Sequence, residues 1–416
     1  MCDTFHLPSG DQIFFGKNSD RNPKEVQVVR IVPQRNPSDS AVVGGRRLCV
    51  PDAGYAMVLS CPTWMEGAEM GVNEKGVAIG NEAVFSKFPA APDGVLGMDF
   101  LKAALMAAGS ATEARDALIA LTEGHAQGGN GALKGKLVYD NSYLISGFDG
   151  AFILETAGKR WAWRELDGPA VISNSYSIQA DYKRLDPASR KSIAPVNDRM
   201  ACLDEADAGR IADKESWKAY VEKGFKPKLM AKLSAGDARR AAIEPALMAA
   251  ADSGGRQAAF SILRAHGLSD PATSGKGRGH GRNVCCHDRD LWGNATTASM
   301  LVERGPDPTR FVAWFTGASY PCSNLFKPIL FDGVFKFLWD GFEKDGEGYW
   351  KGRRETLRRG RTNPAGGDAV AADLSAAQGT LGTIVDALVA SPDTVALGAA
   401  KAEISQLVEN WDARII

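Results

Sequence analysis

The sequence lacks any apolar run that approaches the ~20 residues a helix needs to span a bilayer. It also lacks an excess of charge of either sign, because 49 Lys and Arg stand against 50 Asp and Glu, a net charge of −1 at pH 7. Nucleic acid and anionic membrane surfaces attract strongly basic proteins. We therefore expect neither nucleic acid nor a membrane as a partner.

A secretory signal is also missing, since Met1–His6 contains neither a basic segment nor a long apolar one. A cytoplasmic location is expected. The 7 cysteines are odd in number and stand in a long chain, which argues against a disulfide framework. With only 5 histidines and no phosphate-binding glycine motif, neither a histidine-based triad nor a nucleotide site is expected.

The composition of the 416 residues is that of a globular protein, with 44% apolar and 24% charged residues. Short β-branched and apolar runs predict strands, and two amphipathic segments predict helices at Met98–Ala108 and Thr112–Glu123. Thr112 is the predicted N-cap of the second helix. Strands, then a pair of helices, then more strands favour an α+β fold of stacked layers. The predicted strands are Gln12–Gly16, Glu25–Val32, Tyr55–Ser60, Gly67–Val72, Gly76–Asn81, Ser142–Phe148, Phe152–Glu155, Trp161–Arg164 and Ala170–Ser173. Strand or helix patterns are also expected at Thr296–Glu303 and Phe311–Thr316.

Three further segments have a distinct character. Residues 180–280 are rich in Ala and charged residues with a helical period, which indicates a helical insertion. Within it, Ser274–Gly281 is glycine-rich and basic and is predicted to be a loop. A turn is expected at Asn18–Pro23, and a strand or helix pattern at Asn283–His287. The tail from about 368 to 412 predicts one or two packed helices.

Cys2 is the first candidate for chemistry. Removal of the initiator Met1, which is usual before a small residue, would leave a thiol and a free α-amine on one residue. An α-amine has a pKa near ~8 and can accept a proton near neutral pH. Such a nucleophile carries its own base and needs no histidine. The alternative is that a cysteine stands at position 2 without any function.

The surroundings of Cys2 resemble those of a known family. Met1–Thr4 (MCDT) followed by Phe15–Arg21 (FGKNSDR) resembles the secernin and cysteine-type dipeptidase family of N-terminal nucleophile (Ntn) hydrolases, related to penicillin V acylase and bile-salt hydrolase. Further similar blocks occur in the family's order, and the resemblance covers about residues 1–180 and 280–330. These blocks are Trp64–Val84, Leu96–Asp99, Asn141–Ile145, Leu154–Gly158, Ile172–Asn174, Cys286–His287, Phe315–Gly317 and Pro321–Pro328.

The resemblance implies a four-layer αββα Ntn-hydrolase sandwich with a helical insertion and a helical C-terminal tail. The Ntn-hydrolase domain would span residues 1–335, with residues 180–280 as the insertion. Residues 336–416 would form a helical extension packed on this domain. Cys2 would lie at the end of a core strand, where a catalytic group is held rigidly.

The resemblance also implies roles for single residues. Cys2 would be the nucleophile, and Asp20 would hold the α-amine. Lys17 replaces an arginine of related acylases, which keeps a cation near the thiol without bidentate geometry. Asn81 and Asn174 would donate to the oxyanion. For these two residues the alternative is a plain turn role, since Asn is common in turns.

Two basic positions complete these assignments. Arg21, next to Asp20, is assigned to substrate binding. Related acylases use a late arginine that the sequence does not locate; Arg239 and Arg240 are candidates by order alone.

The function implied is a cysteine-type dipeptidase that cleaves a small peptide without a cofactor. Two alternatives stay open: an amidase or acyltransferase that acts on a non-peptide amide, and a non-catalytic, secernin-like interaction protein. A homo-oligomer is possible. The partner expected is a small peptide or amide substrate.

A metal site is not expected from the cluster His280, Cys285, Cys286, His287 and Asp288. Structural zinc sites usually use two separated ligand pairs, and adjacent Cys-Cys-His lacks that spacing. His287 is instead expected to pack or to hydrogen-bond inside the core.

Overall fold

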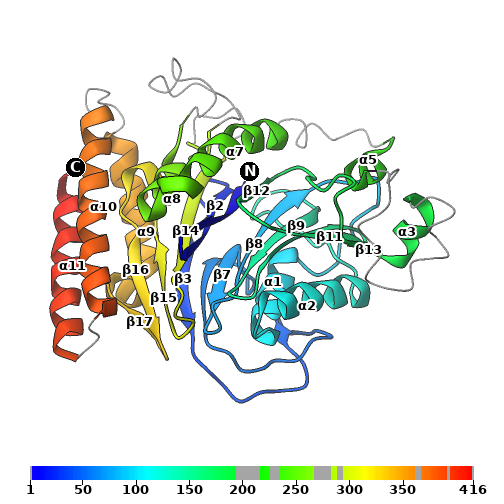
Figure 1. Ribbon diagram of the computed structural model, residues 1–416, viewed down its shortest axis with the longest axis horizontal. Helices are drawn as coiled ribbons and strands as arrows, with labels where there is room; N and C mark the ends of the chain where they lie inside the picture. The colour runs from blue at the N-terminus through cyan, green and yellow to red at the C-terminus, as the bar shows by residue number, and fades with distance from the viewer. Residues whose placement is uncertain are drawn as a thin grey trace.

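The computed structural model describes residues 2–193, 216–224, 235–266, 283–287, 294–360, 367–390 and 394–414. Two antiparallel sheets dominate it (Figure 1). The first has seven strands in the order β12-β1-β2-β14-β15-β16-β17. Their bounds are β1 Cys2–Ser9, β2 Gln12–Arg21, β12 Ala170–Ser173, β14 Ala295–Arg304, β15 Arg310–Phe315, β16 Lys327–Asp332 and β17 Phe335–Phe337.

The second sheet has eight strands in the order β13-β11-β10-β9-β8-β7-β6-β3. Their bounds are β3 Gln27–Val32, β6 Met57–Pro62, β7 Met70–Asn73, β8 Ala78–Val84, β9 Asp140–Ser146, β10 Ala151–Ala157, β11 Arg160–Glu165 and β13 Arg184–Leu185. The short pair β4 (Val42–Val43) and β5 (Arg46–Arg47) forms a separate two-stranded sheet.

Helices cover the outer face of each sheet. Helices α7 (Gly236–Ser253) and α8 (Gly255–Arg264) contact β1, β2 and β12, while α1 (Gly97–Ala107) and α2 (Ala111–Gly124) contact β7 to β10 (Figure 1). The shorter elements are α3 Pro187–Ile193, α5 Trp217–Glu222 and the 3₁₀ turn η2 Pro321–Ser323. The predicted four-layer αββα sandwich is therefore confirmed, and the helices of the insertion supply one of its outer layers.

Apolar side chains that alternate between the two faces of the strands fill two separate cores. In β9, Leu144 joins the cluster between the sheets, where Phe5 and Leu7 of β1 also lie. Its neighbour Ile145 joins the cluster beneath α1 and α2, together with Leu105. Successive side chains of a strand point to opposite faces. The second sheet is thus covered on both faces, and its strands β6 to β10 are buried along nearly their whole length. Strands β3, β11 and β13, nearer the edges, are partly exposed.

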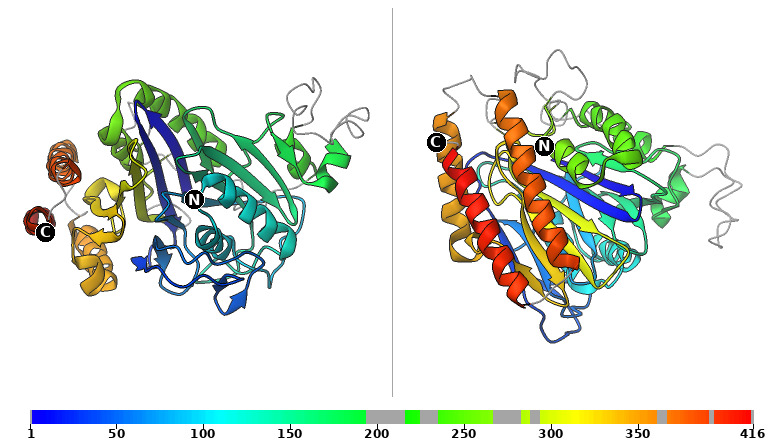
Figure 2. Two further views of the ribbon diagram at one scale, coloured as in Figure 1. Left: turned by 60° about the horizontal axis from the view of Figure 1, so that its bottom comes forward. Right: turned by 60° about the vertical axis from the view of Figure 1, so that its left-hand side comes forward.

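The C-terminal tail is helical, as predicted. It consists of α9 (Gly341–Gly360), α10 (Gly367–Ala390) and α11 (Thr394–Arg414), and Figure 2 shows α10 and α11 side by side. The indole nitrogen of Trp411 donates to the backbone oxygen of Ser323 at 3.2 Å, which ties α11 to η2. None of the helices in the described ranges is long and apolar enough to cross a membrane. The division of the chain at residue 335 stays a prediction.

Several local predictions were wrong. The expected turn at Asn18–Pro23 is strand as far as Arg21, because its backbone pairs with β1 on one side and with β14 on the other. The buried Asn18 amide donates to the backbone oxygens of Leu263 and Val284 at 2.8 and 2.9 Å. Asn283–His287 forms neither strand nor helix. The N-cap of α2 is Ser110, whose hydroxyl accepts from the Glu113 N–H at 3.1 Å. The predicted loop at 274–281 lies outside the described residues.

Gly80 of β8 lies in the second sheet, directly opposite Thr4 and Lys17 of the first sheet. A Cβ at this position would lie 2.6 Å from Cδ of Lys17 and 2.9 Å from Oγ1 of Thr4, both in the opposite sheet. We expect Gly80→Ala to lower the free energy of unfolding by about 1–3 kcal/mol, because the added methyl overpacks the interface. Denaturant unfolding measures this. Gly168→Ala is the control, since no atom lies within 4 Å of its added Cβ; equal losses in both variants would contradict the close approach.

Candidate active site

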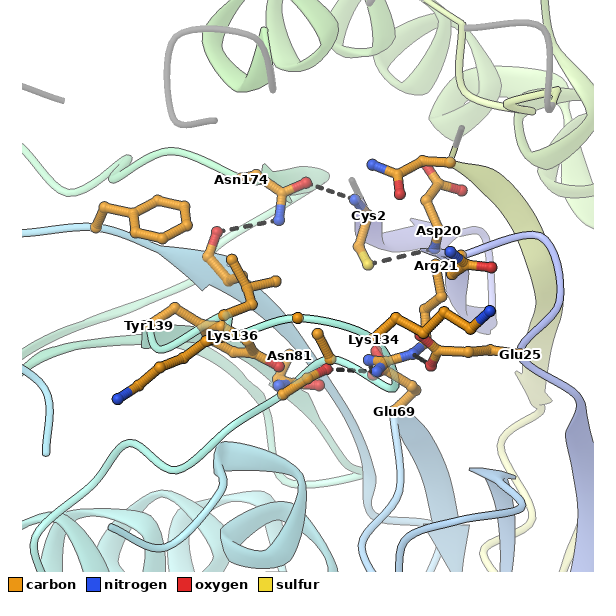
Figure 3. A pocket seen from close by; sticks show the side chains of 18 residues that line it. Cys2, Asp20, Arg21, Glu25, Glu69, Asn81, Lys134, Lys136, Tyr139 and Asn174 are labelled. Carbon is orange, nitrogen blue, oxygen red and sulfur yellow. Dashed lines mark hydrogen bonds and ion pairs between the residues drawn. The ribbon is translucent and has the colours of Figure 1, made fainter. Parts of the chain in front are cut away.

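Cys2 begins β1, which is paired on one side with β2 and on the other with β12. The side chain is 7% exposed. Its backbone nitrogen donates to Oδ1 of Asn174 at 2.5 Å, and its sulfur accepts from the Asp20 N–H at 3.4 Å (Figure 3). The thiol and the nitrogen of one residue are therefore both fixed by neighbouring groups at the end of a central strand.

A cavity of about 420 Å³ opens at Cys2. Four of the residues predicted from the sequence line it with Cys2, namely Asp20, Arg21, Asn81 and Asn174. The fifth, Lys17, is not among the lining residues, but its ammonium group donates to the backbone oxygen of Asn81, which lines the cavity. The rest of the lining comes from Asn22, Glu25, Glu69, Ala83, Phe85, Gly131, Ala132, Lys134, Gly135, Lys136, Leu137, Tyr139 and Asn294.

Asn174 presents its oxygen to the chain start. Besides the Cys2 nitrogen, Oδ1 accepts from Nη2 of Arg239 at 2.9 Å. The amide nitrogen donates to the backbone oxygen of Ala83 at 3.0 Å, which uses one of its two hydrogens. Asn174 thus contacts the Cys2 nitrogen, and the assignment of Asp20 to hold the α-amine stays a prediction.

Asn81 lies across the cavity from Asn174 (Figure 3). Its amide nitrogen donates to Oδ1 of Asn141 at 3.0 Å and to the sulfur of Met98 at 3.5 Å, so that both of its hydrogens have partners. Its side-chain oxygen is buried and has no hydrogen-bond partner within the described part of the chain. Donation of the Asn81 side chain to an oxyanion therefore requires a rotation of its amide away from Asn141.

Lys17 and Glu82 form an ion pair with no exposed side-chain surface. The ammonium group lies 3.1 Å from Oε1 of Glu82 and donates to the backbone oxygen of Asn81 at 2.6 Å. Burial raises the pKa of Glu82 to about 7, and Lys17 acts in the opposite direction. Burial also raises the pKa of the Cys2 thiol, and Lys17 offsets this only in part. The thiol is therefore not a preformed thiolate.

Asp20 connects the thiol to the strand next to it. Its carboxylate accepts from the hydroxyl of Thr296 in β14 at 2.6 Å, and its backbone N–H points to the Cys2 sulfur. Burial raises the pKa of the Asp20 carboxyl. Asp20 thus contacts the thiol through its backbone N–H.

Arg21 is held by two carboxylates on the cavity wall. Its Nε lies 2.6 Å from Oε2 of Glu25, its Nη1 pairs with Glu69, and its Nη2 donates to the backbone oxygen of Gly131 at 2.6 Å. The guanidinium faces the cavity with its charge compensated. Together the three side chains leave a net negative charge at this end of the cavity.

Arg239 of α7 is a residue that the sequence left unassigned. With no exposed surface, it donates to Oδ1 of Asp3 at 3.1 Å, to the backbone oxygen of Cys2 at 2.9 Å and to the hydroxyl of Ser173 at 2.8 Å. The structure separates it from Arg240, which is 23% exposed. The sequence offered no clear signal for this choice, because positions three and four residues before the buried Ile243 lie on the same face of a helix.

No model of a known protein family matches the sequence. The structure is similar to a variant of the conjugated bile acid hydrolase from Clostridium perfringens, at 14% identity and a TM-score of 0.46 over 79% of this chain and 92% of that chain. It is also similar to penicillin V acylase from Agrobacterium tumefaciens (13%, 0.44, 79% and 86%). A third similar structure is the Caenorhabditis elegans ortholog of N-acylethanolamine-hydrolyzing acid amidase (11%, 0.35, 72% and 92%). Likeness this remote leaves the function to be argued from the site.

The Lys17–Glu82 pair is testable through stability. Glu82→Gln leaves a fully buried ammonium group without its counter-charge, and we expect a loss of about 3–5 kcal/mol in the free energy of unfolding. Denaturant unfolding of the purified variant measures it. Glu66→Gln is the matched control, because its ion pair with Lys102 is exposed on the glutamate side and is worth about 1 kcal/mol or less. Similar small losses in both variants would show that the buried pair is not needed.

Proposed function

We propose that the protein is a cysteine-type amide hydrolase of the Ntn class, most simply a dipeptidase, with Cys2 as its nucleophile. The observation that carries the proposal is the position of the thiol and the nitrogen of one residue at the same cavity. The resemblance to the secernin and cysteine-type dipeptidase family points the same way. The proposal requires that Met1 is removed, so that the Cys2 nitrogen becomes an α-amine.

In the first step the Cys2 thiol passes its proton to its own α-amine and attacks the substrate carbonyl. An amine with a pKa near ~8 is a suitable base at neutral pH. Because burial raises the pKa of the thiol, proton transfer and attack would occur together rather than from a stored thiolate. The oxygen of Asn174 would orient the amine during this transfer, and Asp20 would act on its charge.

Two donors would stabilise the tetrahedral oxyanion, the side-chain amides of Asn81 and Asn174. Each donor aimed at a developing negative charge contributes a few kcal/mol to catalysis. The support is that both amides line the same cavity as the thiol. Asn81 would rotate from Asn141 toward the substrate.

The second half of the reaction returns the enzyme to its starting state. The protonated α-amine donates its proton to the leaving nitrogen, the carbon–nitrogen bond breaks, and the acyl group stays on the Cys2 sulfur. Water then loses a proton to the amine and attacks the thioester carbonyl. The carbon–sulfur bond breaks, the thiolate recovers its proton, and a carboxylic acid leaves.

Charges of both signs around the cavity support a small zwitterionic peptide as substrate. Glu25 and Glu69 outnumber Arg21 at one end, and the exposed Lys134 and Lys136 also line the cavity. Lys134 lies beside Arg21 and Glu25, whereas Lys136 lies on the other side (Figure 3). The carboxylates would attract the amino group of a dipeptide, and Lys136 its carboxylate. A cavity of about 420 Å³ suits a ligand of this size. The cytoplasmic location and a homo-oligomer remain proposals.

The nucleophile assignment predicts the fate of both Met1 and Cys2. Purified protein should show an intact mass without Met1, and it should cleave members of a mixed dipeptide library. Cys2→Ala should abolish cleavage, because the only proposed nucleophile is removed, whereas Cys49→Ser, a change at an exposed thiol, should not. Uniform retention of Met1 in an active enzyme would refute the α-amine mechanism. A library left intact while simple acyl amides are cleaved would favour the non-peptide amidase.

The two proposed roles of Asn174, orienting the amine through its oxygen and donating to the oxyanion through its nitrogen, can be separated by mutation. Asn174→Asp keeps an oxygen for Cys2 and Arg239 but loses the amide donor. If the donor stabilises the oxyanion, kcat should fall about 10²-fold or more with a smaller change in KM, and Asn174→Ala should fall at least as far. Steady-state kinetics on a cleaved dipeptide measure both. Near wild-type kcat for Asn174→Asp in a folded protein would mean that only the oxygen matters.

A further inference from the structure

A second cluster of reactive side chains lies outside the cavity at Cys2. His266, Cys285, His287 and Cys322 direct their ligand atoms to within 4.8 Å of one another. The four residues belong to three segments: the end of α8, the strip 283–287 and the turn η2. His287 is 21 residues from His266 and 35 from Cys322 along the chain, so that only the folded protein brings them together.

Three separations within the cluster are close to those of a tetrahedral metal site. Nε2 of His287 lies 3.1 Å from Nε2 of His266, 3.4 Å from Sγ of Cys285 and 3.2 Å from Sγ of Cys322, and the other ligand atoms lie within 4.8 Å of one another. Zinc ligands at ~2.3 Å for sulfur and ~2.0–2.1 Å for nitrogen form a tetrahedron whose edges are about 3.3 Å between nitrogens and about 3.6 Å between nitrogen and sulfur. An ion at the centre of the four atoms needs only small side-chain shifts.

We propose that these four residues bind one Zn²⁺ ion in a structural Cys₂His₂ site. Two thiolates and two imidazoles in tetrahedral arrangement are a typical zinc ligand set, and four protein ligands leave no open position for a substrate. Two thiolates balance the charge of the ion. Binding therefore releases the two thiol protons, and no electron is transferred.

The surroundings fit a bound ion. Cys285 is buried, whereas His266, His287 and Cys322 are half-buried, so the site lies near the surface and is reachable by an ion. The ring of Tyr320 lies 4.9 Å from that of His287 and shields one side. The guanidinium of Arg264 donates to the backbone oxygen of Pro321 at 3.1 Å, which places a positive charge next to the two cysteines.

The proposal departs from the expectation that no metal binds here. That expectation rested on the adjacent residues Cys285, Cys286 and His287, whereas the cluster in the folded protein has a different membership. Cys286 turns away, since its sulfur donates to the backbone oxygen of Asn283 at 3.4 Å. The missing ligands come instead from His266 and Cys322. His280 and Asp288 lie outside the described residues.

The strip that carries two ligands also reaches the cavity at Cys2. The Cys286 N–H donates to the hydroxyl of Thr296 at 2.8 Å, and the Thr296 N–H donates to the Cys286 oxygen at 3.0 Å. The same hydroxyl donates to the carboxylate of Asp20. Zinc would thus hold residues 283–287 in place, and this segment contacts Asp20 through Thr296. The metal itself would take no part in the reaction.

Metal content tests the proposal on the full chain. Protein expressed with added zinc and purified under reducing conditions should contain about one zinc per chain by elemental mass spectrometry. Cys322→Ser and His266→Asn should lose most of it, whereas Cys286→Ser and Cys49→Ser, which remove thiols outside the cluster, should keep it. Stripping the wild type with a chelator should lower its Tm, and zinc should restore it.

Cobalt substitution of the wild type gives an answer that does not depend on the folding of any variant. Co²⁺ should produce the intense visible bands of a tetrahedral site with thiolate-to-metal charge transfer. Three results would overturn the proposal. The wild type could show neither zinc nor the cobalt bands, or Cys322→Ser could retain its zinc. Alternatively, Cys285 and Cys322 could be found joined in a disulfide even after purification under reducing conditions. Loss of zinc has no bearing on whether Cys2 is the nucleophile, so the two proposals fail separately.

Discussion

The beginning of β1, at Cys2 and Asp3, is held in place by hydrogen bonds from the buried guanidinium of Arg239. This guanidinium donates to the backbone oxygen of Cys2, to the carboxylate of Asp3 and to Oδ1 of Asn174. The same Asn174 oxygen accepts from the Cys2 nitrogen. Three elements, β1, β12 and α7, meet at this one side chain. If Met1 is removed, as proposed, this clamp would hold Cys2 in place as the first residue of the chain. The helical layer over the first sheet therefore has a part in the site, in addition to covering the core.

Burial sets the chemistry that the proposed mechanism must use. Burial raises the pKa of the Cys2 thiol, so that the neutral thiol is favoured, whereas Lys17 and Glu82 are paired as ions. A neutral thiol needs a base at hydrogen-bond distance, and in the proposed mechanism the α-amine of the same residue is that base. Lys17 then contributes a fixed positive charge behind Asn81 and does not act as the base. The proposed order of proton transfers follows from these environments.

Much of the fold could be predicted from the sequence because strands and helices leave periodic patterns. Leu144 and Ile145 belong to different cores, and the apolar period of the tail gives its helices. The site was predictable only where its residues are near in sequence, as with Cys2 and Asp20, or where a family resemblance supplied Asn81 and Asn174. Asn18 was misjudged as a turn residue because its partners are about 245 and 266 residues away. Likewise His266 and Cys322 complete their cluster only through tertiary structure, which local spacing cannot express.

The central claim is that a covalent acyl group forms on the sulfur of Cys2. The most direct test is acid quenching of the enzyme during turnover of an activated dipeptide ester, followed by mass mapping of its peptides. The account predicts the acyl mass on the N-terminal peptide, which begins with Cys2 and carries no Met1, as a thioester that a neutral hydroxylamine treatment removes. Turnover with no adduct on that peptide, or with the adduct on another cysteine, would contradict it.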